Sequence, residues 1–186
     1  MPQTAIKTYR VTIEGVRPLL MNKWIPDDAS TKKRGEAQDS PEMAKKRAYI
    51  VDGKLVMPAE WIERAMHSVS SSFKLPGHGK KTYKDLIGGA ISIEPEFIEL
   101  TPQEYKIDER TVVIPATRGR VLRYRPRLDP GWRATFHIHV FDSRIGKDVL
   151  ENILAEAGRL KGVGDGRSIG MGRFIIVEFK EANEEN

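Results

Sequence analysis

The sequence predicts an α+β fold, because two different apolar periods occur in separate segments of the chain. Residues 132–141 alternate apolar and polar side chains, which is the pattern of a strand that buries one face. Residues 58–73 and 147–160 repeat apolar side chains every three or four positions, which is the pattern of helices with one buried stripe. With 186 residues and 39% hydrophobic content the chain can bury a core, and we expect residues 1–186 to form a single domain.

The other predicted elements give these segments a regular order. Pro58 suits the first turn of the first helix, and Asp52-Gly53 before it predicts a two-residue hairpin turn. The remaining predicted strands cover residues 8–15, 90–98, 111–114 and 173–179. The order strand, helix, strand, strand, helix, strand is the βαββαβ pattern, so we predict a ferredoxin-like antiparallel sheet with two helices on one side.

Two segments fall outside this pattern. Residues 16–48 have no apolar period and are interrupted by proline and glycine, which is typical of a functional loop or a disordered insertion. Residues 181–186 form a short acidic tail that we expect to fray.

Composition excludes several classes of protein. The chain has no cysteine, which excludes disulfides, a thiol nucleophile and cysteine-ligated metals, and which suits the reducing cytoplasm. No apolar stretch is long enough to span a bilayer, and the start of the chain has no signal core, so we expect a cytoplasmic protein without membrane contact. The formal net charge of +5 favours a polyanionic partner without requiring one.

The most distinctive feature is a glycine cluster between the second helix and the last strand. Six of the sixteen glycines fall within residues 158–172. Glycine permits positive backbone angles and close approach, so the amides there can converge on a nucleic-acid backbone. The candidate binding residues of this loop are Lys161, Gly164, Gly166, Arg167, Ser168, Gly170 and Arg173. The alternative is a sharp helix-to-strand connection. The spacing fits neither a Walker loop nor a dinucleotide-binding loop, so we expect no nucleotide cofactor.

A second basic segment lies before the clearest strand. Residues 117–133 contain six arginines and one acid, and the candidate binding residues are Arg118, Arg120, Arg123, Arg125 and Arg127. Arginine grips phosphates with two parallel hydrogen bonds, while Tyr124 and Trp132 offer faces for unstacked bases, a combination suited to single strands. The alternative is a solvated edge kept soluble by its charges.

The histidines are weaker candidates. His137 and His139 lie two apart on one strand face, but no third ligand accompanies them, so we expect no metal site. His78 in its glycine-rich loop could act as an acid or base near a phosphate, and His67 lies at the border of a helical stripe.

The segment GVGDGRSIGMGRF at residues 162–174, between a helix and a final strand, resembles the RAMP superfamily of CRISPR-associated RNA-binding proteins. The segment LVMPAEWI at residues 55–62 is similar to the one with which backbone-type members enter their first helix. The resemblance implies a ferredoxin-like or RRM-like core and binding of single-stranded RNA by the glycine-rich loop and by a protruding arginine-rich hairpin, here residues 117–131. It also implies assembly with further copies or other RAMP-type subunits along a guide, in antiviral defence.

The chain departs from that family in two ways. It is shorter than typical backbone subunits, and it has one recognisable glycine-rich loop. Residues 170–177 match the RNP signature of RRM proteins only loosely, so stacking of bases on the sheet is not implied.

Three functions follow from these patterns. The first is a non-enzymatic subunit of a CRISPR-type ribonucleoprotein that binds single-stranded RNA. The second is a metal-independent endoribonuclease that uses His78, His67 or His137 as acid or base. The third is a phage or mobile-element protein that binds single-stranded DNA through the same basic segments.

Overall fold

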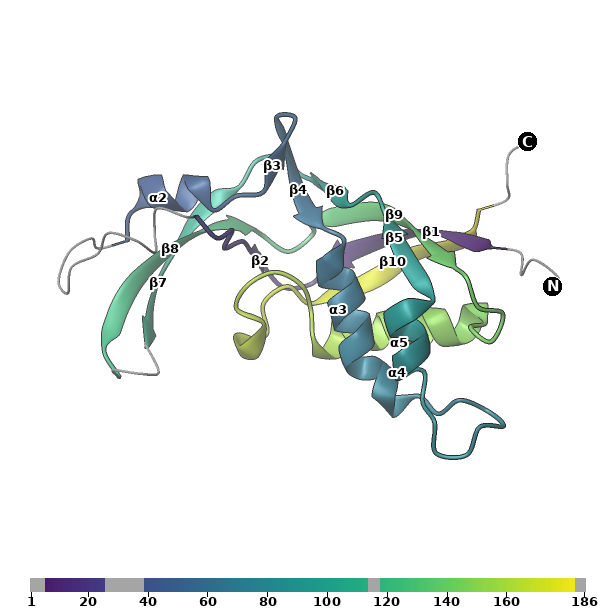
Figure 1. The fold of residues 1–186 in the computed structure, drawn as a ribbon. Coiled ribbons are helices and arrows are strands. Elements are labelled where there is room, and N and C mark those ends of the chain that lie inside the picture. Colours follow the sequence, from purple (N-terminus) through teal and green to yellow (C-terminus); the bar gives the residue numbers. More distant parts are fainter. Residues whose placement is uncertain (1–5, 26–38, 114–117, 183–186) are drawn as a thin grey trace.

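The structure is a computed structural model that describes residues 6–25, 39–113 and 118–182 (Figure 1). Within these residues the larger sheet has seven strands: β1 (Lys7–Gly15), β3 (Ile50–Val51), β4 (Lys54–Pro58), β5 (Ile91–Glu94), β6 (Phe97–Thr101), β9 (Arg133–Val140) and β10 (Phe174–Glu181). β10 is an edge strand, and β1 lies next to it, between β10 and β9. β9 pairs on its other side with β5 and then with β6, which continues the sheet to β4 and β3. All of these pairings are antiparallel.

Three helices cover one face of this sheet: α3 (Glu60–Val69), α4 (Lys84–Gly89) and α5 (Lys147–Leu160) (Figure 1). The apolar stripes predicted for α3 and α5 are buried beneath them. On β9 the predicted inward face is buried as well, and Trp132 just before the strand is fully enclosed. The sequence prediction of an α+β fold with antiparallel pairing is therefore confirmed, and the strand order is compatible with a ferredoxin-like fold.

Two predicted elements have different bounds in the structure. Pro58 ends β4 instead of opening a helix, and α3 stops at Val69, where a 3₁₀ turn (Ser70–Ser72) follows. The predicted strand 90–98 is two strands, β5 and β6, on either side of Pro95. Proline has no N–H for the ladder and therefore interrupts a strand inside a sheet.

A second, smaller sheet projects from the main body (Figure 1). It consists of β2 (Leu19–Leu20), β7 (Lys106–Val113) and β8 (Arg120–Leu128), in the order β2, β8, β7. A short helix, α2 (Pro41–Lys46), packs on β8. β2 joins the smaller sheet to the body, because it pairs with the end of β8 and also meets the glycine-rich loop at Asp165.

This arrangement corrects the predicted arginine-rich hairpin. Residue 117 lies outside the described residues, and residues 118–131 do not fold back on themselves: they supply the single strand β8, which pairs with β7 from Val113–Arg120 to Lys106–Arg127. Of the predicted short strand 111–114, residues 111–113 are the end of β7, and residue 114 lies outside the described residues. Pro126 lies inside the ladder opposite Ile107 and not in a turn, so the partner of β8 is the upstream strand β7.

The two segments outside the predicted pattern are partly described. Within residues 16–48 the structure has β2 and α2, and residues 26–38 lie outside the described part of the chain. Ser40 begins α2 as its N-cap and accepts a hydrogen bond from the Met43 amide at 3.2 Å. In the predicted acidic tail, Glu181 ends β10, and residues 183–186 are outside the described residues.

Candidate nucleic-acid interface

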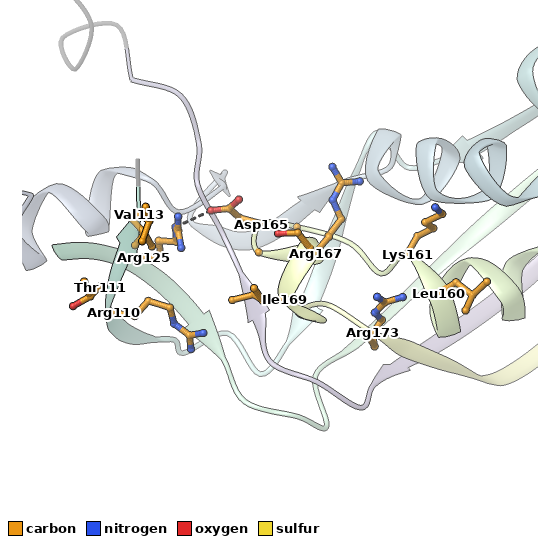
Figure 2. A pocket seen from close by; sticks show the side chains of 14 residues that line it. Arg110, Thr111, Val113, Arg125, Leu160, Lys161, Asp165, Arg167, Ile169 and Arg173 are labelled. Atoms are coloured by element: carbon orange, nitrogen blue, oxygen red, sulfur yellow. Dashed lines mark ion pairs between the residues drawn. The ribbon is translucent and has the colours of Figure 1, made fainter. Parts of the chain in front are cut away.

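A groove of about 870 Å³ lies between the β7–β8 hairpin and the glycine-rich loop (Figure 2). The hairpin contributes residues 110–113 and Arg125 to one wall. The end of α5 and the loop contribute Leu160, Lys161, residues 164–169 and Arg173 to the other. Two basic segments that are separate in the sequence therefore face one cavity.

The groove is strongly cationic. Among the described residues that line it, five are basic and one is acidic: Arg110, Arg125, Lys161, Arg167 and Arg173 against Asp165. Lys161 and Arg167 are exposed, and neither has an ion-pair partner within the described part of the chain. A phosphate that enters the groove therefore meets two cations that no carboxylate of the described residues neutralises.

Other cations of the groove are engaged within the protein. Arg173 donates to the carbonyl oxygen of Arg159 at 3.0 Å, so it caps the carboxyl end of α5. Arg125 Nε lies 2.7 Å from Asp165 Oδ2, an ion pair that crosses from the hairpin to the loop. Their positive charge still contributes to the field of the groove.

The hairpin holds its charges in register. Asp108 and Arg110 of β7 lie opposite Arg125 and Arg123 of β8, and of these four residues Arg110 and Arg125 line the groove. Asp108 accepts hydrogen bonds from Arg110 at 2.6 and 2.8 Å and from Arg127 at 3.1 Å. Burial would raise the pKa of Asp108, but these hydrogen bonds outweigh it and hold the pKa below its ordinary value. Asp108 is therefore a charged anchor that fixes the guanidinium groups on both sides of it.

The glycine-rich loop owes part of its glycine content to close packing. Gly172 has φ of +69°, and a Cβ there would lie 1.7 Å from the carbonyl oxygen of Val163. Gly164 has φ of +77°, and its Cβ would lie 2.5 Å from the carbonyl oxygen of Leu20. The amides of Asp165 and Gly172 are bonded to Leu20 and Pro18. The alternative explanation from the sequence, a tightly packed connection, thus accounts for much of the cluster, while residues 164–169 line the groove.

The structure brings together only part of the predicted binding set. The predicted residues that line the groove are Arg125, Lys161, Gly164, Gly166, Arg167, Ser168 and Arg173. The predicted residues that are not part of its described lining are Arg118, Arg120, Arg123, Arg127 and Gly170. Arg123 and Arg127 point to carboxylates of the hairpin region instead, at Asp39 (3.8 Å) and Asp108 (3.1 Å).

Sequence reasoning missed other residues of the groove. Arg110 was not a candidate because β7 was not recognised as the partner strand of the hairpin. The alternation of Lys106, Asp108 and Arg110 with other residues was the available signal. The exposed apolar residues Leu160 and Ile169 carry no sequence signal for this site.

The histidines lie elsewhere. His78 is exposed in the loop between the 3₁₀ turn Ser70–Ser72 and α4, with its Nδ1 2.8 Å from the carbonyl oxygen of Pro76. His67 lines a different cavity, between α3 and α4. His137 and His139 lie on the sheet face opposite the helices, and His139 contacts Thr8 at 2.9 Å. Among the described residues no histidine lines the basic groove.

Within residues 6–25, 39–113 and 118–182, no three histidine, aspartate or glutamate side chains gather in a way that could hold a metal ion. None of the helices in this part of the chain is long and apolar enough to cross a membrane.

Comparison with known proteins shows the fold. No family model matches the chain, and no curated protein matches its sequence. A chain of the type III-B Cmr-beta complex, solved by cryo-EM bound to its cognate target RNA, matches with a TM-score of 0.58 at 15% identity. A chain of a type IV-B CRISPR complex matches with a TM-score of 0.53 at 12% identity.

The extent of the two matches differs. Each covers 96% of this chain, but they cover 61% of the Cmr-beta chain and 92% of the type IV-B chain. The protein therefore spans less than two thirds of the first neighbour and nearly all of the second. At these identities the likeness concerns the fold.

Proposed function

We propose that the protein is a non-enzymatic subunit of a CRISPR-type ribonucleoprotein and that it binds single-stranded RNA in the basic groove. The observation that carries this proposal is the convergence of the hairpin and the glycine-rich loop on one groove with five cations and one acid. A groove of this charge attracts a sugar-phosphate strand and releases counterions from it. The shared fold with chains of two CRISPR complexes supports the same class of partner.

A single strand suits the groove better than a duplex. Beside its cations the groove has exposed apolar side chains, Val113 (58% exposed), Leu160 (43%) and Ile169 (55%). A duplex offers a protein mainly phosphates and groove edges, whereas a single strand also offers ribose and base faces that can pack on apolar side chains. Phosphate contacts of this kind carry no sequence information, so we expect little preference for base sequence.

The same proposal extends to fold family and partners. β1, α3, β5, β9, α5 and β10, with strand order β10, β1, β9, β5, correspond to a βαββαβ ferredoxin-like core. We assign this core to the RAMP type on the basis of its strand order and its glycine-rich loop. Other RAMP-type subunits or further copies of the chain are the protein partners that this assignment entails.

The decisive experiment measures binding of the purified protein to a 20-nucleotide RNA, the same DNA sequence and the RNA duplex, by fluorescence anisotropy at several salt concentrations. We expect tighter binding to single-stranded RNA than to either alternative. Lys161→Ala/Arg167→Ala removes two cation–phosphate contacts, so the slope of log K against log salt should fall by about 1.4.

The matched control is Lys80→Ala/Lys81→Ala, which removes the same charge from the exposed loop between the 3₁₀ turn Ser70–Ser72 and α4. Equal effects of the two double variants would refute the groove as the binding site. Preference for DNA would instead favour a single-stranded DNA-binding protein. RNA cleavage in the presence of a chelator that is lost in His78→Ala would restore the endoribonuclease hypothesis.

A further inference from the structure

The carboxylate of Asp165 occupies an unusual position in the groove. It is the one acidic side chain among the described lining residues, and it lies among cations on a loop that faces the hairpin (Figure 2). Its Oδ2 is 2.7 Å from Nε of Arg125. The side chain of Arg125 is 15% exposed and that of Asp165 is 32% exposed, so the pair lies partly open to the groove.

The geometry of this ion pair is poorer than that of its neighbours. Asp165 Oδ2 is enclosed and has no well-aligned hydrogen-bond donor among the residues that the structure describes, so its contact with Arg125 is mainly electrostatic. By contrast, Arg110 grips both oxygens of Asp108 with hydrogen bonds of 2.6 and 2.8 Å. A carboxylate that lacks aligned donors is easier to displace than one held by two.

The backbone around Asp165 is held independently of this ion pair. The Asp165 amide donates to the carbonyl oxygen of Leu20 at 2.8 Å. Gly164 beside it packs against the same residue of β2. The loop therefore keeps its place on β2 when the carboxylate leaves Arg125, and only the side chain has to move.

We propose that Asp165 is an internal counter-ion that occupies the place of a phosphate in the unbound groove, and that strand binding replaces the Arg125–Asp165 pair with an Arg125–phosphate pair. This inference rests on the proposed function, because it names the contact that regulates the same groove. The carboxylate weakens binding in two ways: it holds Arg125, and it repels phosphates that approach Lys161 and Arg167. It thereby disfavours weakly bound polyanions, which cannot make enough other contacts to displace it.

The alternative is that the Arg125–Asp165 ion pair has only a structural role. If the ion pair only fixes the hairpin against the loop, its removal loosens the groove, and binding weakens. The two roles predict changes of opposite sign for the same variant, so the sign of the change decides between them.

The test is Asp165→Asn, which keeps the shape of the side chain and removes its charge. We expect this variant to bind the 20-nucleotide RNA about three- to tenfold more tightly than the wild type, as expected for loss of a partly buried ion pair and of one repulsive charge. The salt dependence should steepen by about 0.7, because one more cation meets a phosphate. Asp165→Ser removes the same charge without an amide and serves if the asparagine variant does not fold.

The matched control is Asp129→Asn. Asp129 lies at the end of the hairpin, pairs with Lys106 at 2.5 Å and Arg127 at 3.0 Å, and is not part of the described lining of the groove. Its substitution changes the net charge by the same amount, and we expect less than a twofold change in affinity. Equal gains in both variants would show a general effect of charge and overturn the proposal, as would weaker binding by Asp165→Asn.

A second probe separates this inference from the proposed function. Inorganic polyphosphate carries the charge of a strand without ribose or bases. If neither the wild type nor Asp165→Asn binds RNA, but Asp165→Asn binds polyphosphate more tightly than the wild type, the RNA assignment fails and the counter-ion role stands. If RNA binds but Asp165→Asn changes neither affinity, the counter-ion role fails alone. If neither probe binds any of the proteins, both fail.

Discussion

A buried ion pair between Asp39 and Arg47 joins the segment around α2 to the hairpin. Both side chains are 3% exposed. Arg47 Nη1 donates to the two carboxylate oxygens of Asp39 at 2.7 and 2.8 Å and to the carbonyl oxygen of Tyr124 at 2.9 Å. The Tyr124 amide donates to Asp39 Oδ2 at 2.9 Å. The perturbation of interest is Asp39→Ala, which removes one member of this network.

The expected cost follows from burial. With Asp39 gone, the Arg47 guanidinium keeps its charge in an enclosed position, and the Tyr124 amide loses its acceptor. Removal of one partner of a buried ion pair costs about 3–5 kcal/mol, because the other charge stays buried and loses the charge that faced it. In a chain of this size, about 1 kcal/mol shifts the melting temperature by about 2–4 °C, so we expect a decrease of roughly 10 °C.

The assay is equilibrium unfolding in urea, with the melting temperature as a second measurement. The double variant Asp39→Leu/Arg47→Met tests the explanation, because replacing a buried pair by apolar side chains is often nearly neutral. We therefore expect the double variant to be more stable than Asp39→Ala alone. A loss below about 1 kcal/mol in Asp39→Ala, within the range of exposed pairs, would refute the reasoning.

Two shorter predictions concern the loop and a turn. Gly172→Ala should prevent the glycine-rich loop from closing and should lower the melting temperature well below that of Gly170→Ala. Both glycines have positive φ, but a Cβ at Gly170 meets nothing within 4 Å. Thermal unfolding of the two variants checks this, and equal melting temperatures would contradict it. The hydrogen bonds from the Arg144 side chain and amide lower the pKa of Asp142 to about 2, so the carboxylate stays charged in mild acid. Arg144→Ala removes the side-chain hydrogen bonds and keeps the one from the amide, so an NMR titration of this variant should show the pKa raised part of the way toward about 3.9, and an unchanged midpoint would contradict the assignment.

Much of the body of the protein was predictable because its elements bury one face each. The alternation at 132–141 and the stripes of α3 and α5 are local patterns, and the structure buries the predicted residues. The smaller sheet was harder, because β7 and β8 project from the body and are mostly half exposed or exposed. A strand that buries neither face has no clear apolar period, so its partner cannot be identified from periodicity.

The sequence predicted the two segments that form the candidate site, but not all of the residues that line it or the contacts between them. The glycine cluster and the arginine-rich segment both reach the groove. Arg110 comes from a strand that only the pairing with β8 brings there. Asp165 is visible in the sequence inside the glycine cluster, but its contact with Arg125, forty residues away, depends on the fold.

The arginines of β8 illustrate why a count of charges overstates a binding surface. Arg125 is paired with Asp165 at 2.7 Å, and Arg127 with Asp108 at 3.1 Å. Such pairs stabilise the hairpin, and they also neutralise much of the charge that the sequence displays. Lys161, in contrast, has no carboxylate partner within the described residues, so its charge is available to a ligand.

Cations that are paired with a carboxylate and cations that are not should therefore have different effects on stability and on the salt dependence of binding. Arg127→Ala removes one hydrogen bond from the enclosed Asp108 carboxylate, while Arg110 keeps its own two, so we expect a loss of about 1–2 kcal/mol in unfolding free energy. Its effect on the salt dependence of RNA binding should be small. Lys161→Ala should do the reverse and lower the salt slope by about 0.7 with little change in stability. Urea unfolding and anisotropy on the same two proteins measure both quantities. A salt slope that falls as much in Arg127→Ala as in Lys161→Ala would mean that paired arginines of the hairpin also contact the strand.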